Sequence, residues 1–289
     1  MRVVRVGSRD SKLAVVQAEM VMEAIRAFDP EIVLELVLMK TTGDKILDRT
    51  LDKIGGKGLF VKELDEALEN NLVDITVHSC KDLPAELPKH LPIVAFSKRE
   101  DVRDVLILPQ HITDDTKPLG CCSKRRMWQL RDLDGRDVQP VRGNLQTRLR
   151  KLDAGEYSGI ILAAAGIKRL GLQDRISRYY TTEEMIPAAG QGVVAVQGRQ
   201  GENTDYLQLF HCAESAVIVA AERAYVKALD GGCSSPIAAY GQLIAGELFL
   251  QGLYVDELRE VVRTGFIKGA PEQAEQIGYA LAEQLRNGE

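Results

Sequence analysis

The fold is indicated by residues 75–84, which read Ile75-Thr76-Val77-His78-Ser79-Cys80-Lys81-Asp82-Leu83-Pro84. The first four residues form a short, mostly apolar segment, which predicts a strand that runs directly into a polar loop. A helical pattern over residues 59–70 precedes this strand. Strands that alternate with helices are typical of a parallel α/β sheet, whose ligands bind beyond the carboxyl ends of the strands. We therefore expect Lys81 and Asp82 at a ligand-binding edge.

The chain before this segment shows the same alternation. Residues 3–7 and 32–39 predict two strands, and apolar residues at helical spacing from Leu13 to Phe28 predict an amphipathic helix between them. Ser8-Arg9-Asp10-Ser11 supplies capping side chains at the turn from strand to helix. Residues 41–58 are polar and rich in glycine, and a loop of that length inside a compact domain is often a lid.

Two further blocks follow along the chain. A second α/β block is predicted from strands over 105–108 and 160–165 and from helices over 123–131, 144–152 and 167–170. The segment 187–192 is interpreted as a crossover. The run 190–195 matches the dinucleotide motif G-x-G-x-x-A, but it follows no clear strand, and we interpret it as a hinge. A helix over 213–229, strands over 237–243, 247–255 and 260–267, and a helix over 274–285 predict a separate α+β domain with an antiparallel sheet.

Composition narrows the functional class. The 289 residues are 45% hydrophobic and 27% charged, as in a soluble globular protein of two or three domains. The net charge of -5 provides no basic field for nucleic acid or membrane, and no apolar run reaches the roughly 20 residues of a membrane span. The N-terminus reads as a strand and not as a signal peptide. Five cysteines without C-x-x-C spacing argue against disulfides and a metal site, so we expect a cytoplasmic protein.

Two residues are candidates for chemistry. Asp82 follows a predicted strand and lies beside Lys81 in the sequence. It is either a general acid/base, with the charge of Lys81 adjusting the local electrostatic field, or an aspartate that caps a turn. Cys233 lies in Gly231-Gly232-Cys233-Ser234-Ser235-Pro236, outside any apolar run. It is either a reactive thiol or a small buried apolar residue.

Several arginines lie beside small polar residues where helices are predicted to begin. They are Arg9, Arg125, Arg126, Arg142 and Arg148. Any one of them is usually a solvated surface charge, but guanidinium groups at helix N-termini together favour a substrate with several carboxylates. Nucleic acid fits less well, because aromatic residues make up 5% of the chain and are not interleaved with these arginines.

Taken in order, these segments resemble the porphobilinogen deaminase (hydroxymethylbilane synthase) family from Arg5 to about Leu285. The shared motifs are Arg9 and Ser11, Gly55 to Leu64, His78 to Pro84, Ser123, Arg125-Arg126, Arg142-Gly143-Asn144, Thr147-Arg148, Gly190-Gln191-Gly192, Ala221-Glu222-Arg223-Ala224 and Gly231-Gly232-Cys233.

The resemblance implies a fold of three domains. Residues 1–96 with 191–209, and residues 99–187, would form two α/β domains like the halves of periplasmic binding proteins. Residues 211–289 would form a smaller α+β domain with a three-stranded antiparallel sheet. It also implies hinges near 96–99 and 187–191, and a monomer.

The resemblance further implies a transferase with a dipyrromethane cofactor, linked as a thioether to Cys233. Such an enzyme condenses four molecules of porphobilinogen onto the cofactor, releases ammonia at each addition, and then releases hydroxymethylbilane by hydrolysis. This linear tetrapyrrole leads to heme, siroheme and cobalamin. Nucleic acid and membranes would not be partners.

The roles of individual residues follow from the same resemblance. Asp82 would be catalytic. Lys81, Asp82, Ser123, Arg125, Arg126, Arg142 and Gly143 would bind the cofactor. Arg9, Ser11, Arg148 and Gln191 would bind substrate, and Lys57 and Phe60 would belong to the lid.

The chain differs from the family's pattern at Cys121-Cys122, where Thr-Ser is usual, and thiols are weaker hydrogen-bond donors than hydroxyls. Two alternatives to an active deaminase stay open. The cysteine pair suggests a degenerate paralogue that binds pyrroles without turnover. Because fold does not fix function, a protein that only binds small anions on the same two-lobed scaffold is the other. Ammonia release from porphobilinogen would separate the enzyme from both.

Overall fold

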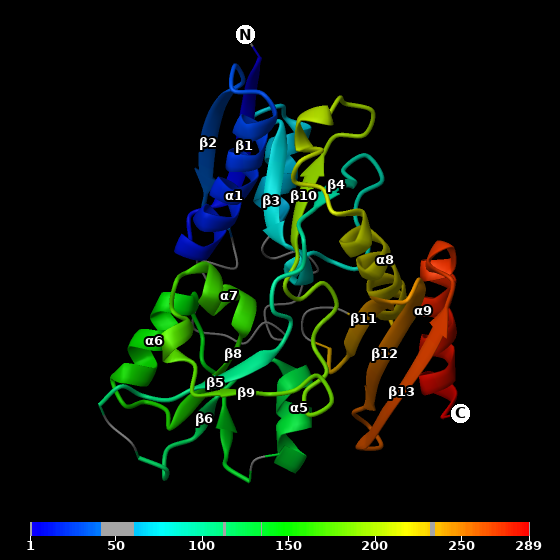
Figure 1. Cartoon of the computed structure of the whole chain (residues 1–289). Coiled ribbons are helices and arrows are strands. Elements are labelled where there is room, and N and C mark those ends of the chain that lie inside the picture. The colour runs from blue at the N-terminus through cyan, green and yellow to red at the C-terminus, as the bar shows by residue number, and fades with distance from the viewer. Residues whose placement is uncertain (1, 42–60, 112–113, 134, 232–234, 289) are drawn as a thin grey trace.

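The computed structural model describes residues 2–41, 61–111, 114–133, 135–231 and 235–288, which form three sheets with their helices (Figure 1). Among these residues, no helix is long and apolar enough to cross a bilayer. The predicted fold class is confirmed: two α/β domains are followed by a smaller α+β domain with a three-stranded antiparallel sheet. The exact domain limits remain a prediction.

The first sheet has the strand order β2-β1-β3-β10-β4. Its strands are β1 (Val3–Arg9), β2 (Val33–Met39), β3 (Ile75–Ser79), β4 (Ile93–Phe96) and β10 (Val194–Gly198). Helix α1 (Lys12–Phe28) begins at Ser11, whose hydroxyl accepts a hydrogen bond from the amide of Ala14, and it buries one face against this sheet. The other elements of this domain are α4 (Lys62–Glu69) and the 3-10 turns η1 (Cys80–Asp82) and η3 (Asp205–Leu207).

The second sheet has the order β7-β6-β8-β5-β9. Its strands are β5 (Asp104–Ile107), β6 (Leu119–Gly120), β7 (Val138–Gln139), β8 (Gly159–Ala163) and β9 (Arg178–Tyr179). Its helices are α5 (Lys124–Leu133), α6 (Leu145–Asp153), α7 (Ala164–Arg169) and the 3-10 turn η2 (Gln173–Arg175). The amide oxygen of Asn144 caps α6 by accepting from Thr147 N at 3.0 Å.

The third sheet has the order β11-β12-β13, and helices pack on one of its faces. Its elements are α8 (Ala213–Ala228), β11 (Ala238–Ile244), β12 (Glu247–Asp256), β13 (Val261–Gly269), η4 (Pro271–Gln273) and α9 (Ala274–Asn287). Gly278 lets α9 approach α8 closely, because a Cβ there would collide with the carbonyl oxygen of Ala221. In Figure 1, α8 lies between the first sheet and α9.

The expectation of parallel sheets is wrong in part, because both large sheets are mixed. Strand β10 runs antiparallel to β3 and β4, and β5 runs antiparallel to β8 and β9. The physical reason is the path of the chain, which leaves the first sheet after β4, builds the second, and returns as β10. The hinge interpretation of residues 190–195 is also wrong at its end, since β10 begins at Val194.

Candidate active site

A cleft of about 650 Å³ lies between the two α/β domains and reaches α8 of the third. Parallel strands of both large sheets end there: Arg9 ends β1, Ser79 ends β3, and the segments that follow β6, β7 and β8 line the opposite wall. The N-termini of α1, α5 and α6 also lie at the cleft, where they add partial positive charge. The cleft therefore occupies the strand-end position expected of ligand sites in α/β sheets.

Positive charge dominates this cleft. Among the described residues, nine arginines and lysines and two aspartates line it: Arg9, Lys40, Lys81, Arg125, Arg126, Arg142, Arg148, Arg169 and Arg223, with Asp10 and Asp82. All the predicted cofactor- and substrate-binding residues that the structure describes are thus brought together, from positions far apart in the sequence. Such an excess of cations suits a ligand with several carboxylates.

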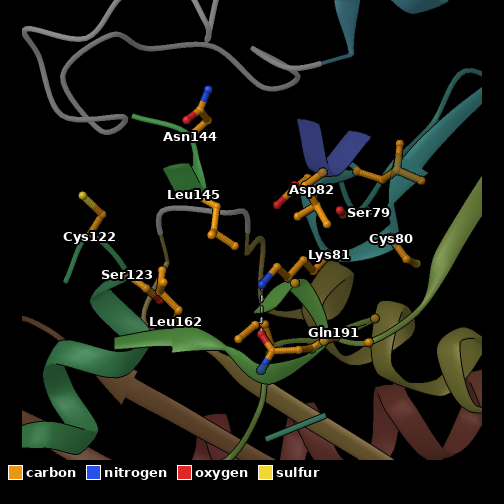
Figure 2. Close-up of a pocket in the computed structure, with 18 of the residues that line it drawn as sticks. Ser79, Cys80, Lys81, Asp82, Cys122, Ser123, Asn144, Leu145, Leu162 and Gln191 are labelled. Carbon is orange, nitrogen blue, oxygen red and sulfur yellow. Dashed lines mark hydrogen bonds between the residues drawn. The ribbon is translucent and has the colours of Figure 1, made fainter. Parts of the chain in front are cut away.

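The loop after β3 carries Lys81 and Asp82 into the cleft (Figure 2). The turn is anchored by Cys80, whose amide donates to Val193 O at 2.9 Å. The pKa of Lys81 is lowered to about 8, mainly by burial and also by the neighbouring charge of Arg126, while Asp82 acts in the opposite direction. Asp82 lines both the cleft and a smaller recess of about 60 Å³.

The two other titratable residues of this loop region are unsuited to chemistry. Burial raises the pKa of the Cys80 thiol to about 11, so Cys80 behaves as a small buried apolar residue. Burial also lowers the pKa of His78 to about 3, with Arg9 acting in the same direction. His78 therefore stays neutral near pH 7, and its Nε2 lies 2.9 Å from Thr76 Oγ1.

Arg125 and Arg126 are buried and share one carboxylate. Asp104 lies with its two oxygens 2.7 Å from the Nη2 atoms of Arg125 and Arg126. Burial alone would raise the pKa of Asp104, but the two guanidinium groups hold it below its usual value. The cluster keeps one net positive charge at the cleft wall, less than two solvated arginines would provide.

The start of α6 places two more arginines. Arg148 donates from Nε to Gly143 O at 2.8 Å, and Arg142 lines the same wall. Gly143 has a φ of +112°, and a Cβ there would lie 2.6 Å from Thr147 Cγ2. This position accepts only glycine without strain.

Ser11, Gln17 and Ser79 form the polar floor on the side of the first sheet. Gln17 is buried, and its Nε2 donates a hydrogen bond to Ser79 Oγ at 2.9 Å. Arg9 and Ser11 line both the cleft and the small recess beside Asp82.

Sequence reasoning gave no role to two cleft arginines. Arg169, in the last turn of α7, donates from Nη2 to Gly192 O at 2.6 Å. Arg223 donates from Nη2 to Pro84 O at 2.8 Å and to Ala85 O at 3.0 Å, so α8 contacts the loop that carries Asp82. Arg223 stood in a shared motif, which was a usable signal, but nothing local distinguishes Arg169 from a surface arginine.

The adjacent cysteines point in different directions. Cys121 is fully buried in the core of the second sheet and does not line the cleft. Cys122 lines the cleft beside Ser123, and its thiol donates to Val141 O at 2.9 Å. Within the described cleft wall, the difference from the family's Thr-Ser therefore concerns Cys122. Three predicted site residues, Cys233, Lys57 and Phe60, lie outside the described residues.

Comparison with known proteins decides the family. Residues 4–206 match the profile described as "Porphobilinogen deaminase, dipyromethane cofactor binding domain", and residues 216–287 match the profile of its C-terminal domain. This chain belongs to the porphobilinogen deaminase family. Porphobilinogen deaminase of Ruminiclostridium cellulolyticum is 57% identical over 289 residues, covering 99% of each chain. The enzyme of Acetivibrio thermocellus is 53% identical over 288 residues, covering 99% of this chain and 98% of the relative.

Solved structures outside the family have lower similarity. The BenM effector binding domain with benzoate is 14% identical, covering 72% of this chain and 88% of that chain, with a TM-score of 0.43. The periplasmic aliphatic sulphonate binding protein SsuA from Escherichia coli is 11% identical, covering 80% and 71%, with a TM-score of 0.39.

The family's cofactor is dipyrromethane, and the cleft residues fit it. Two linked pyrroles that each bear an acetate and a propionate carry several negative charges, and the described cleft wall offers nine cations. Ser123 supplies a hydroxyl and the N-termini of α5 and α6 supply partial positive charge on the same wall. The residues predicted to hold the cofactor are therefore present where an anionic group would need them.

Proposed function

We propose that this enzyme of tetrapyrrole synthesis is a transferase that condenses four molecules of porphobilinogen into hydroxymethylbilane on a dipyrromethane attached through Cys233. The observation that carries the proposal is the charge of the cleft, which nine cations line together with Asp82, in the turn that follows β3. Porphobilinogen bears an acetate, a propionate and an aminomethyl group, so each addition brings two more carboxylates to be bound. When bound, the dipyrromethane supplies the free pyrrole carbon to which the first substrate is joined.

We divide the binding residues by the ligand that each would hold. Arg9 and Ser11, at the end of β1, and Arg148 would bind the carboxylates of the incoming substrate. The carboxylates of the cofactor would be bound by Lys81 and by residues of the opposite wall: Ser123, Arg125, Arg126, Arg142 and Gly143. Guanidinium groups suit this task, because they bind carboxylates with two parallel hydrogen bonds.

Asp82 would act on the reacting centre. In each addition the carbon–nitrogen bond of the aminomethyl group breaks, ammonia leaves, a carbon–carbon bond forms to the substrate's methylene carbon, and the attacking pyrrole carbon loses a proton. Positive charge develops on the substrate's pyrrole nitrogen as ammonia leaves, and a nearby carboxylate stabilises that charge. In its protonated form the same side chain would give a proton to the leaving amine, and as a carboxylate it would then take up the proton that the attacking carbon loses.

We further propose a cytoplasmic monomer whose domains are residues 1–96 with 191–209, 99–187 and 211–289. Movement at 96–99 and 187–191 would make room for the growing chain. Both segments connect the two large sheets, which supports this placement of the hinges.

The test is ammonia release together with the mass of the denatured protein. Active protein carries an added mass of two linked pyrroles on the peptide of Cys233, and it releases ammonia from porphobilinogen. Asp82→Asn should lower turnover by at least about 100-fold without unfolding the chain. Asp115→Asn, at an exposed carboxylate that does not line the cleft, should leave turnover unchanged. An unmodified chain that releases no ammonia would contradict the proposal and favour the degenerate paralogue.

A further inference from the structure

The side chain of Gln191 joins the two walls of the cleft. Its Oε1 accepts from Lys81 Nζ at 3.1 Å, and its Nε2 donates to Val102 O at 2.8 Å and to Asp104 Oδ1 at 2.9 Å. Figure 2 shows the ammonium of Lys81 directed at this amide. Lys81 belongs to the loop after β3 in the first sheet, whereas Asp104 begins β5 in the second. One fully buried amide therefore connects two domains.

The backbone leaves this amide little freedom. Gly190 and Gly192 flank it with φ values of +70° and +86°. A Cβ on Gly190 would lie 2.7 Å from Cys80 Sγ, and one on Gly192 would collide with the carbonyl oxygen of Glu100. The segment is thus pressed between the Lys81 loop and the outgoing crossover, so the position of Gln191 is set by its neighbours.

The charges on either side determine which end of the amide points where. Lys81 is a donor and needs the oxygen, while Asp104 is an acceptor and needs the nitrogen. Asp104 also pairs with Arg125 and Arg126, so Gln191 connects Lys81 to that whole cluster. A carboxylate at position 191 would face Asp104 with like charge, and an aliphatic side chain would leave Lys81 and Asp104 without this bridge.

We propose that Gln191 is a positioning residue that holds Lys81 in register with the Arg125–Asp104–Arg126 cluster, so that the carboxylate-binding groups of both walls are preorganised. This role rests on the proposed function for its purpose, and it replaces the substrate contact expected from the family resemblance. All three polar contacts of the amide described above are to protein atoms, which leaves little of it for a ligand.

The experiment measures the reactivity of Lys81 with acetic anhydride as a function of pH, read by peptide mass, in the full-length chain. A Cys233→Ser background keeps the cleft free of an attached pyrrole. Accepting a hydrogen bond from the ammonium favours its charged form. Gln191→Leu should therefore raise the labelling rate of Lys81 about fivefold near pH 6, well below its pKa of about 8, which is the effect of losing one hydrogen bond. Gln191→Glu should lower that rate, because it adds a negative charge beside Lys81.

Two controls separate positioning from general damage. Gln197→Leu removes another fully buried amide, from β10, whose Nε2 donates to Leu91 O at 3.0 Å, and it should leave the labelling of Lys81 unchanged. The double variant Gln191→Glu with Asp104→Asn exchanges the carboxylate and the amide. This comparison is made in chains that keep Cys233, and cofactor loading is the fraction of those chains that carry the added mass. The double variant should load more cofactor than Gln191→Glu alone.

The outcomes are distinct. Opposite shifts for Gln191→Leu and Gln191→Glu support the positioning role. Parental labelling in both variants, with normal loading and a raised KM, would overturn it and restore the substrate contact. The labelling requires no turnover, so a chain that never releases ammonia would refute the proposed function and still report on Gln191.

Discussion

Glu222 of α8 offers the sharpest test of how the three domains are held together. Its carboxylate is 1% exposed and accepts two hydrogen bonds from Arg99, each at 2.8 Å. It also accepts from Gly190 N at 2.7 Å and from Gly241 N at 2.8 Å. Arg99 and Gly190 lie in the two connections between the large sheets, and Gly241 lies in β11. One buried carboxylate therefore ties both connections to the third domain.

Glu222→Gln keeps the shape and removes the charge. Arg99 is then left buried without its counter-ion, and the new amide nitrogen faces a backbone donor. Breaking a buried ion pair by removing one partner costs about 3–5 kcal/mol. At roughly 2–4 °C per kcal/mol for a chain of this size, the midpoint of thermal unfolding should fall by about 6–20 °C.

The assay is thermal unfolding followed by circular dichroism, with Glu247→Gln as the matched control. Glu247 pairs with Lys268 at 3.0 Å, but both side chains are about half exposed, so its loss should cost less than about 1 kcal/mol. If Glu222→Gln lowers the unfolding midpoint by less than about 2 °C, the reasoning is refuted, since the carboxylate would then contribute little to holding the three domains together.

Three further predictions concern single positions. Gly192→Ala should lower the free energy of unfolding, measured in urea, by about 1–3 kcal/mol or more, because its φ is +86° and a Cβ there would collide with the carbonyl oxygen of Glu100. The control Gly201→Ala, with a φ of +81° but open space around it, should lower it less. Burial, with a contribution from Glu69, raises the pKa of Asp65 to about 6, so the native state binds this proton more tightly than the unfolded chain does. The ionised carboxylate therefore destabilises the fold above pH 6, and this destabilisation disappears as the pH falls towards 4. Asp65→Asn should therefore raise the unfolding midpoint at pH 8 and raise it much less at pH 4.5; an equal effect at both would contradict the assignment. Cys122→Ser should load the cofactor at least as fast as the parent by intact mass, because a hydroxyl is the stronger donor; slower loading would show that the thiol is required.

How much of the site could be read from the sequence is clear from the loop after β3. The run of apolar residues into Lys81-Asp82 predicted a strand end with polar side chains, and the structure places both residues in the cleft. Arg9, Arg142 and Arg148 were found in the same way, since Arg9 and Arg142 lie between a strand and the next helix and Arg148 lies in the first turn of α6. These features are local, and periodicity and capping patterns report on local structure.

What the tertiary structure alone decided depends on partners far along the chain. Strand β10 pairs with β3 across more than a hundred residues, and no pattern within its five residues reveals an antiparallel return. The sharing of Asp104 by Arg125 and Arg126, the burial of Cys121 and the bridge through Gln191 likewise arise from contacts between segments. Residue types and spacing therefore determined which chemistry this chain contains, whereas packing determined which charges remain available at the cleft, because burial and pairing belong to the assembled fold.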